Sequence, residues 1–276
     1  MNDRDLSTAH DELRRYVERW RLTPDGAPFH THSSLLQPVR HGGTPAMLKL
    51  AVEAEERAGA ALMVWWNGDG AARVLEHDGS ALLMERAVGE ASLAEMARGG
   101  RDDEASRILC AAAARLHAPR DRPQPLAVPL PEWFRDLEPA ATGHGGVLAQ
   151  AAATARELLR EPRDVAILHG DIHHENVLHF GSRGWLAIDP KCLIGERGFD
   201  FANIFCNPDA ETALAPGRLA RQASVVAEAA GLERRRLLQW ILAFAGLSTA
   251  WSLTDGDVPE LSLDVAEIGA AELAGY

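Results

Sequence analysis

The stretch LHGDIHHENVLHFGSRGWLAIDP, residues 168–190, is unlike the rest of the chain. Its polar loop leads into two short apolar segments, which a turn at residues 181–184 joins into a predicted hairpin. Asp171 lies in the loop, Asn176 lies just before the first apolar segment, and Asp189 ends the second. Carboxylate and amide oxygens suit a hard cation such as Mg²⁺, which in proteins usually accompanies phosphate. The stretch therefore predicts a magnesium-phosphate site.

These side chains correspond to the parts of a kinase site, where one aspartate accepts a hydroxyl proton while an asparagine and a second aspartate hold metal. The run HGDIHHEN at 169–176 resembles the catalytic loop of aminoglycoside phosphotransferases and related small-molecule kinases. The run IDP at 188–190 resembles the metal-binding segment of that family, and GERGFDFA at 195–202 resembles the segment that follows it. The resemblance covers residues 34–206 in motif order.

A further pattern narrows the resemblance. The run WWNGDGA at 65–71, together with HHEN at 173–176 and GWLAIDP at 184–190, is similar to the streptomycin 6-phosphotransferase branch of aminoglycoside and hydroxyurea resistance kinases. The resemblance implies an ATP-dependent enzyme that moves the γ-phosphoryl group to a hydroxyl of a small molecule, an aminoglycoside of the streptomycin type. ATP and Mg²⁺ are the implied cofactors. A kinase of another small hydroxylated metabolite is the nearest alternative.

The order of predicted elements agrees with that family. Before residue 87 the sequence predicts two strands, a helix and two more strands, at 34–39, 46–50, 52–66, 72–76 and 81–85. After residue 87 the pattern is mainly helical. We therefore expect an α+β fold of the bilobal protein-kinase-like type, with a small antiparallel-sheet lobe at residues 1–86 and a larger helical lobe at residues 87–276.

The resemblance assigns the catalytic roles to the polar stretch. Asp171 would position and deprotonate the attacking hydroxyl, and Asn176 and Asp189 would hold Mg²⁺ on the ATP phosphates. His169 and His173 are expected to support the loop. Asp200 precedes a predicted helix that it could cap, and in the resembled family it also steadies the catalytic loop.

The nucleotide side is expected in the N-terminal lobe. Lys49 would pair with the α- and β-phosphates, and a carboxylate of the following helix would orient it. The candidate carboxylates are Glu53, Glu55 and Glu56. We select Glu56, because it shares its helix face with apolar residues and so faces the core. Backbone groups of Glu85 and Ala87 would bind adenine.

One part of the kinase pattern is missing from the sequence. No G-x-G-x-x-G precedes Lys49, and the equivalent stretch is THSSLL at 31–36. We expect the hydroxyls and backbone amides of Ser33 and Ser34 to cover phosphate in its place.

The acceptor site carries the weakest signal. It is expected in the C-terminal lobe, where Trp251, Asp255 and Asp257 are the candidate residues. The acidic run that continues to residue 264 could meet a cation that bears guanidinium groups, as streptomycin does. Taken by itself, Trp251 fits a core position better than a substrate contact.

Composition restricts the partners. Of 276 residues, 46% are apolar and 25% charged, which is typical of a globular protein. A net charge of −12 disfavours nucleic acid and favours a cationic or neutral small molecule.

The longest apolar run, 58–66, is far shorter than the about 20 residues of a membrane span. The N-terminus shows no secretory signal. Three separated cysteines without C-x-x-C suggest neither a disulfide framework nor a thiolate zinc site, so we expect a cytoplasmic protein. No obligate protein partner is indicated.

Two other classes remain to be weighed. Four histidines and Glu175 fall within residues 169–179, a composition that would also suit a metal-dependent hydrolase. The absence of H-E-x-x-H disfavours this alternative, and so does the adjacency of His173 and His174, which cannot easily face one ion. A binding module without catalysis is also disfavoured. All four side chains with an expected role in catalysis are present: Lys49, Asp171, Asn176 and Asp189.

Overall fold

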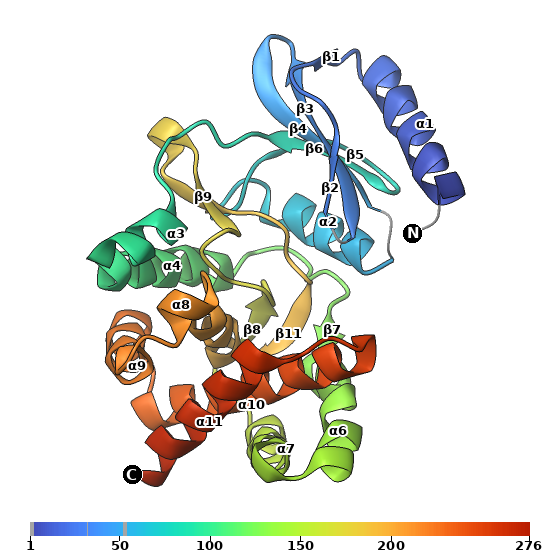
Figure 1. The fold of residues 1–276 in the computed structure, drawn as a ribbon. Coiled ribbons are helices and arrows are strands. Elements are labelled where there is room, and N and C mark those ends of the chain that lie inside the picture. Colours follow the sequence, from blue (N-terminus) through green and yellow to red (C-terminus); the bar gives the residue numbers. More distant parts are fainter. Residues whose placement is uncertain (1–2, 32, 52–53) are drawn as a thin grey trace.

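The computed structural model of the chain describes residues 3–31, 33–51 and 54–276. The N-terminal part is built around one antiparallel sheet, and the larger C-terminal part is mainly helical (Figure 1). The two termini lie at opposite ends of the molecule (Figure 1). The expected α+β, bilobal protein-kinase-like architecture is therefore confirmed, whereas the exact lobe boundary at residues 86 and 87 stays a prediction.

The strands of the described residues are β1 (Thr23–Pro24), β2 (Phe29–His30), β3 (Ser34–His41), β4 (Thr44–Ala51), β5 (Val74–Asp78), β6 (Ala81–Glu85), β7 (Val128–Pro129), β8 (Val165–Leu168), β9 (Val177–His179), β10 (Trp185–Ala187) and β11 (Leu193–Glu196). The α-helices are α1 (Asp3–Arg19), α2 (Ala54–Trp66), α3 (Leu93–Met96), α4 (Asp102–His117), α5 (Leu130–Trp133), α6 (Leu137–His144), α7 (Gly146–Arg160), α8 (Ala210–Ala213), α9 (Arg218–Ala230), α10 (Arg234–Asp255) and α11 (Glu260–Ala274). A π-helical turn, η1 (Ala97–Arg101), and three 3-10 segments, η2 (Phe134–Asp136), η3 (Gly181–Arg183) and η4 (Arg197–Cys206), complete the elements.

The N-terminal sheet runs in the order β1-β3-β4-β6-β5, and β2 pairs with the edge of β3. The β3–β4 turn uses Gly42 and Gly43, both at positive φ, as the Gly-Gly pair predicts. Side chains alternate along β4, so Leu48 and Leu50 pack under α1 in one apolar cluster. Lys49 lies between them in sequence and therefore projects from the opposite face, towards the C-terminal part.

Helix α2 connects the two parts of the molecule. Its apolar residues, including Met63 and Trp66, are buried in the same apolar cluster as the core of the C-terminal part. Gly59 lets the helix approach the backbone that follows Asp189, because a Cβ at this position would lie 2.1 Å from the carbonyl oxygen of Pro190. A glycine in a helix interior costs about 1 kcal/mol relative to alanine, and this close approach explains its presence.

The C-terminal part is organised around α10, which packs against α7, α11 and η4. By length and composition α10 could also cross a membrane, but 67% of its apolar window is buried inside the protein. Two small sheets support the polar loop between them: the β9–β10 hairpin, and a three-stranded sheet in the order β7-β11-β8. The loop of residues 169–176 runs from the end of β8 to the start of β9.

Candidate active site

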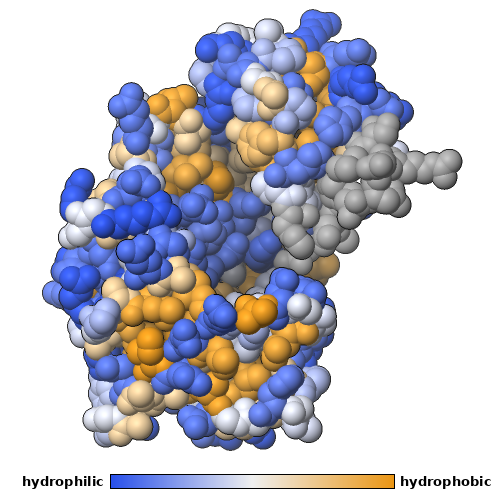
Figure 2. Space-filling model, viewed as in Figure 1, coloured by the Kyte–Doolittle hydropathy of each residue, from blue (hydrophilic) through white to orange (hydrophobic). Residues whose placement is uncertain are grey.

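The space-filling view shows a hollow between the two parts that hydrophilic residues line (Figure 2). The nucleotide side of the site is a charged cluster whose members, Lys49, Glu56 and Asp189, line one small cavity. Lys49 from β4 forms ion pairs with Glu56 of α2 and with Asp189, which follows β10. The Lys49 and Glu56 side chains are 9% and 3% exposed, whereas Asp189 is 37% exposed. Lys49 and Glu56 therefore pair as the sequence predicts, and Asp189 joins them.

Glu56 is the centre of this cluster. Its oxygens also accept hydrogen bonds from the hydroxyls of Ser33, at 2.7 Å, and Ser34, at 3.3 Å, and Lys191 Nζ lies 3.5 Å away. Burial alone would raise the pKa of Glu56, but the charge and hydrogen bond of Lys49, together with Ser33 and Lys191, outweigh burial and lower it. The two serine hydroxyls are thus occupied by Glu56, which differs from the predicted phosphate contact. Any phosphate contact by Ser33 and Ser34 is left to their backbone amides and stays a prediction. The alternative carboxylates Glu53 and Glu55 lie outside the described side chains.

Backbone pairing fixes Asp189 relative to α2. The segment after α2 forms a bridge to β10 through Ala71 and Ala187, and two backbone hydrogen bonds of 2.9 and 3.0 Å flank this bridge. Asp189 itself has a φ of 62°, which is uncommon for a residue other than glycine and redirects the chain after β10. The bridge between Ala71 and Ala187 and the close approach of Gly59 to Pro190 together hold Asp189 in this uncommon conformation.

On the acceptor side, Asp171 is held by two asparagines. Asn176 donates from Nδ2 to the Asp171 carbonyl oxygen at 2.9 Å and to Oδ2 at 3.1 Å. Asn203 of η4 donates from Nδ2 to Oδ1 at 2.7 Å. Both carboxylate oxygens of Asp171 therefore accept hydrogen bonds, while its side chain remains 29% exposed. A carboxylate anchored in this way, yet open to the outside, can receive a proton from a bound hydroxyl.

Asn176 and Asp189 provide a donor set that fits Mg²⁺. The two positions are neighbours across the β9–β10 hairpin, because the Ile188 amide donates to the Asn176 carbonyl oxygen at 2.9 Å. The Asn176 amide nitrogen is directed at Asp171, which leaves its Oδ1 for a cation. Mg²⁺ is usually held by only one or two protein oxygens, with phosphate and water completing its shell, so this pair suffices.

Asp200 steadies the catalytic loop instead of capping a helix. It lies inside η4, so the predicted start of a helix after it is wrong. Its carboxylate accepts hydrogen bonds from the amides of His169, at 2.9 Å, and Gly170, at 2.7 Å, and contacts His117 Nε2 at 2.7 Å. Burial would raise the pKa of Asp200, but His117 and the loop amides lower it.

His169 and His173 both contact Asp171, and His173 Nε2 lies 3.9 Å from Asp171 Oδ2. His169 accepts from the Asp171 amide at Nδ1 and its Nε2 lies 2.7 Å from the Ile188 carbonyl oxygen, and burial lowers its pKa, so the ring is neutral. His173 Nδ1 accepts from the Glu175 amide at 3.2 Å. Within residues 3–31, 33–51 and 54–276, no three histidine, cysteine, aspartate or glutamate side chains gather as metal ligands would. The geometry therefore does not fit the metal-dependent hydrolase alternative.

His174 differs from its neighbours. The side chain is 1% exposed, and within the described part of the chain neither ring nitrogen has a hydrogen-bond partner. Burial lowers the pKa of His174 to about 4, with a further contribution from the nearby Arg218. The catalytic loop is therefore built for a neutral imidazole at this position.

The predicted adenine contacts lie where β6 ends. The Glu85 amide donates to the Arg73 carbonyl oxygen at 2.9 Å, so it is already used within the N-terminal part. The Glu85 carboxylate pairs with Arg183, which also donates to the Gly68 carbonyl oxygen at 2.6 Å. Glu85 thus joins the sheet to the β9–β10 hairpin. The contacts of the Glu85 and Ala87 backbones with adenine stay a prediction.

A polar cavity of about 300 Å³ adjoins the acceptor side. It is lined by Asn203, Cys206, Asn207, Ser248, Ser252, Val258, Pro259, Leu261 and Ser262. Trp251 packs edge-to-face on Trp133, with ring centroids 5.4 Å apart, at the margin of the core. Asp255 and Asp257 are exposed and do not line this cavity. The structure thus brings together Asn203 and Asn207 beside Asp171, and leaves the three predicted acceptor residues at the periphery.

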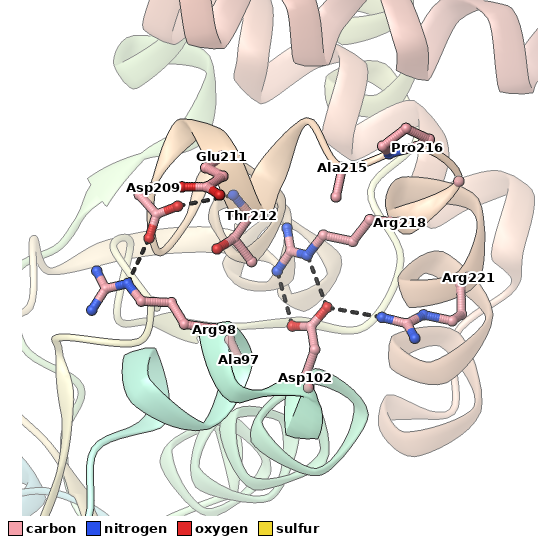
Figure 3. Close-up of a pocket in the computed structure, with 12 residues that line it drawn as sticks. Ala97, Arg98, Asp102, Asp209, Glu211, Thr212, Ala215, Pro216, Arg218 and Arg221 are labelled. Atoms are coloured by element: carbon pink, nitrogen blue, oxygen red, sulfur yellow. Dashed lines mark hydrogen bonds and ion pairs between the residues drawn. The ribbon is translucent and has the colours of Figure 1, made fainter.

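The largest cavity described lies beside the acceptor side, between η1, α8 and α9, and encloses about 580 Å³ (Figure 3). Its charged side chains pair with one another: Arg98 with Asp209, at 2.7 Å, and Arg218 with Asp102, at 2.8 Å. Hydrogen bonds from the Thr212 backbone and Arg98 lower the pKa of Asp209 to about 2. Neither the nucleotide cluster nor Asp171 lines it, so it is not the transfer site.

Sequence reasoning missed three residues of this site. His117, the partner of Asp200, ends α4 far from any motif, and its only signal was a histidine in the last turn of a helix. Asn203 lies one residue beyond the matched run at 195–202. Gly59 could have been found from the sequence, because a glycine within a helical pattern usually indicates close packing against another segment.

Comparison with known proteins identifies relatives along almost the whole chain. Residues 19–256 match the profile of the family described as aminoglycoside/hydroxyurea antibiotic resistance kinase. A streptomycin 3''-kinase of Klebsiella pneumoniae is 56% identical over 245 residues, covering 87% of this chain and 92% of the relative. A streptomycin 6-kinase of Streptomyces griseus is 33% identical over 275 residues, covering 88% of this chain and 83% of the relative.

Solved structures resemble the fold. An aminoglycoside phosphotransferase of Streptomyces rimosus, in complex with ADP and streptomycin, superimposes with a TM-score of 0.59 at 19% identity. The match covers 88% of this chain and 98% of that one. At this identity the likeness establishes the architecture, in agreement with the sheet and helix order described above.

Proposed function

We propose that this protein, which belongs to the aminoglycoside/hydroxyurea antibiotic resistance kinase family, transfers the γ-phosphoryl group of ATP to a hydroxyl of streptomycin. One observation carries the proposal. The Lys49–Glu56–Asp189 cluster and the Asp171–Asn176 pair, which are far apart in sequence, converge on the loop and hairpin of residues 169–189. This convergence provides a phosphate-binding side and a hydroxyl-activating side in one site.

On the nucleotide side, Lys49 binds the α- and β-phosphates, and Glu56 holds its ammonium in place. The same ammonium pairs with Asp189, which brings the lysine beside the proposed metal ligand. Backbone groups of Glu85 and Ala87 bind the adenine. The predicted cytoplasmic location agrees with a donor that the cell keeps in that compartment.

Asn176 Oδ1 and Asp189 would hold Mg²⁺, which when bound neutralises charge on the phosphates. Asp189 is the only carboxylate of this pair, so its negative charge accounts for most of the attraction. Asn176 serves both sides at once, since its Nδ2 holds Asp171 while its Oδ1 is left for the cation. Asn176 would thereby connect the metal site to the base, Asp171.

On the acceptor side, Asp171 accepts the proton of the attacking hydroxyl as the oxygen–phosphorus bond forms. His169, His173 and Asp200 keep the loop that carries Asp171 in place. The acceptor lies in the polar cavity beside Asn203, with Trp251, Asp255 and Asp257 at its outer margin. We place the phosphate on the 3''-hydroxyl, because the relative of that name has 56% identity and the 6-kinase 33%.

The test is a purified enzyme assayed for ADP formation with Mg·ATP and each of streptomycin, kanamycin and hydroxyurea. Streptomycin alone should support turnover, and ³¹P–¹H correlation spectra of the product should locate the phosphate at the 3'' position. A product phosphorylated at position 6 would show that the assigned hydroxyl is wrong, while streptomycin would remain the acceptor. Turnover with none of the three would remove the proposed acceptor, while stabilisation by Mg·ATP in a thermal shift would still support the kinase class.

A further inference from the structure

Asp171 has two asparagine partners of different kinds. Asn176 holds Oδ2 and belongs to the loop motif, and its own Oδ1 is proposed above as a Mg²⁺ ligand. Asn203 holds Oδ1 from outside the loop, at 2.7 Å, which is the shorter of the two contacts. Asn203 has no proposed role in binding nucleotide or metal. Its contact with Asp171 therefore needs an explanation of its own.

The amide of Asn203 is fixed in one orientation. Asn207 Nδ2 donates to Asn203 Oδ1 at 3.0 Å and to the Asn203 carbonyl oxygen at 2.9 Å. Because the oxygen of the Asn203 amide accepts this hydrogen bond, its nitrogen is the atom that must face Asp171. A rotated amide would place oxygen against carboxylate and lose both contacts.

The 3-10 segment η4 places Asn203 and Asp200 on one face. Residues three apart eclipse one another in a 3-10 helix, and both side chains point at the catalytic loop. Asp200 binds the loop backbone at His169 and Gly170, and Asn203 binds the carboxylate of the next residue. One short element thus holds the loop and the side chain that it carries.

We infer that Asn203 is a positioning residue that orients the Asp171 carboxylate toward the acceptor hydroxyl, and that Asn207 acts through Asn203 by fixing its amide. The inference rests on the proposed function, in which Asp171 receives the hydroxyl proton. With Oδ1 held from one side and Oδ2 from the other, the carboxylate plane cannot rotate. Losing the Asn203 contact frees this rotation, and a misplaced catalytic group of this kind costs up to about 100-fold in rate.

The first test is Asn203→Leu, which keeps the volume and removes the donor. We expect kcat at saturating streptomycin to fall about 10- to 100-fold, while the KM for Mg·ATP stays within about twofold, because Asn203 does not touch the nucleotide side. Asn203→Asp should be at least as slow, because it lacks the donor and also sets a second carboxylate against Asp171. Gln37→Leu is the control: it removes a buried side-chain amide from β3 on the far face of the N-terminal sheet, and should retain full kcat.

Coupling between the two asparagines is the second test. Asn207→Leu should lower kcat less than Asn203→Leu does, because the Asn203 amide can still reach Asp171 part of the time. The double variant should be no slower than Asn203→Leu alone, since Asn207 acts only through Asn203. Losses that multiply in the double variant would overturn the role of Asn207, and a kcat within twofold of wild type in Asn203→Leu would overturn that of Asn203.

A readout without turnover separates this inference from the proposed acceptor. Crystal structures of wild type and Asn203→Leu should show the Asp171 carboxylate rotated in the variant alone, with the loop backbone unchanged. If wild type phosphorylates no streptomycin, the proposed acceptor fails, and the rotation still supports the positioning role. An Asp171 side chain in the wild-type orientation in Asn203→Leu overturns it.

Discussion

The two sides of the transfer site are built from different kinds of side chain. The nucleotide side pairs full charges across the two parts of the molecule, with Lys49 between Glu56 and Asp189. The acceptor side surrounds one charge, Asp171, with neutral amides of the C-terminal part. Charge neutralisation on one side and orientation on the other are the two demands of phosphoryl transfer.

This difference has a consequence for how each side fails. Removing one member of a buried ion cluster leaves another charge without its partner, which is costly. Removing a neutral amide from Asp171 leaves a carboxylate that is still partly in contact with water. Binding of nucleotide should therefore depend on the charged side, and the rate of the chemical step on both.

The largest expected effect separates the two aspartates. Asp171→Ala should lower kcat by about two to four orders of magnitude, the usual range for a general base, with Mg·ATP affinity nearly unchanged. Asp189→Ala should lose Mg²⁺-dependent nucleotide binding as well as turnover, because the remaining oxygen donor, Asn176, is neutral. Asp189→Asn should resemble Asp189→Ala.

Calorimetric titration of Mg·ATP into each variant, without acceptor, measures this split. Asp11→Asn, an exposed aspartate of α1, is the control for loss of one negative charge. Wild-type affinity in both variants would show that Asp189 does not hold the metal. Loss of binding in Asp171→Ala alone would reverse the two roles.

The second prediction concerns His174, in the loop that both sides share. Its pKa falls from about 6.5 in an unfolded chain to about 4 in the folded protein because it is buried. Between these values the unfolded state binds a proton and the folded state does not, so the free energy of unfolding falls as the pH is lowered. The loss should reach about 3 kcal/mol by pH 4, roughly a hundredfold in the unfolding equilibrium.

His174→Leu should remove this contribution to the dependence of the free energy of unfolding on pH. Urea unfolding at intervals from pH 7.5 to pH 4.5 gives the difference between wild type and variant, in which contributions of other groups cancel. His144→Leu, an exposed histidine that ends α6, should keep the wild-type slope. Equal slopes in wild type and His174→Leu would contradict the buried neutral imidazole.

How much of this could be predicted differs between the two sides. Asp171, Asn176 and Asp189 were selected from short motifs, and Lys49 and Glu56 from their places in the predicted strand and helix. The structure pairs Lys49 with Glu56 and Asp189, and Asp171 with Asn176. Such motifs are readable because a charged group that must meet phosphate or metal occurs in a fixed local pattern. The family and the fold class, confirmed by the comparisons and by the sheet order, follow from the same residues.

The acceptor side could not be predicted in this way. Asn203, Asn207 and Ser248 come from η4, the segment that follows it, and α10, which only the packing of the C-terminal part brings together. Amides and hydroxyls are also common throughout any sequence.

A third prediction tests the charged side from the lysine. Lys49→Met keeps the volume of the stem and removes the cation, so the phosphates lose their partner and Glu56 its principal counter-charge. Turnover should fall well over tenfold, since electrostatic positioning of the phosphates is lost. Lys191→Met removes the more distant ammonium, 3.5 Å from Glu56, and should reduce turnover less. Steady-state kinetics with melting temperatures for both variants distinguish catalysis from folding, and a Lys49→Met enzyme of normal turnover would mean that another group binds the phosphates.

The smallest effect is expected at the outer margin of the acceptor side. Asp255 and Asp257 are exposed and lie just before Val258 and Pro259, which line the polar cavity. Exposed charges attract a cationic acceptor weakly and over a distance of about 10 Å at 0.1 M salt. The double variant Asp255→Asn/Asp257→Asn should therefore raise the KM for streptomycin by less than about fivefold at low salt, without changing kcat.

The increase should vanish at 0.5 M salt, and Asp11→Asn/Glu18→Gln, an equal loss of exposed charge on α1, should leave KM unchanged. A large increase in KM that persists at high salt would mean that the two aspartates contact the acceptor directly, and the neutral character of the acceptor side would then have to be given up.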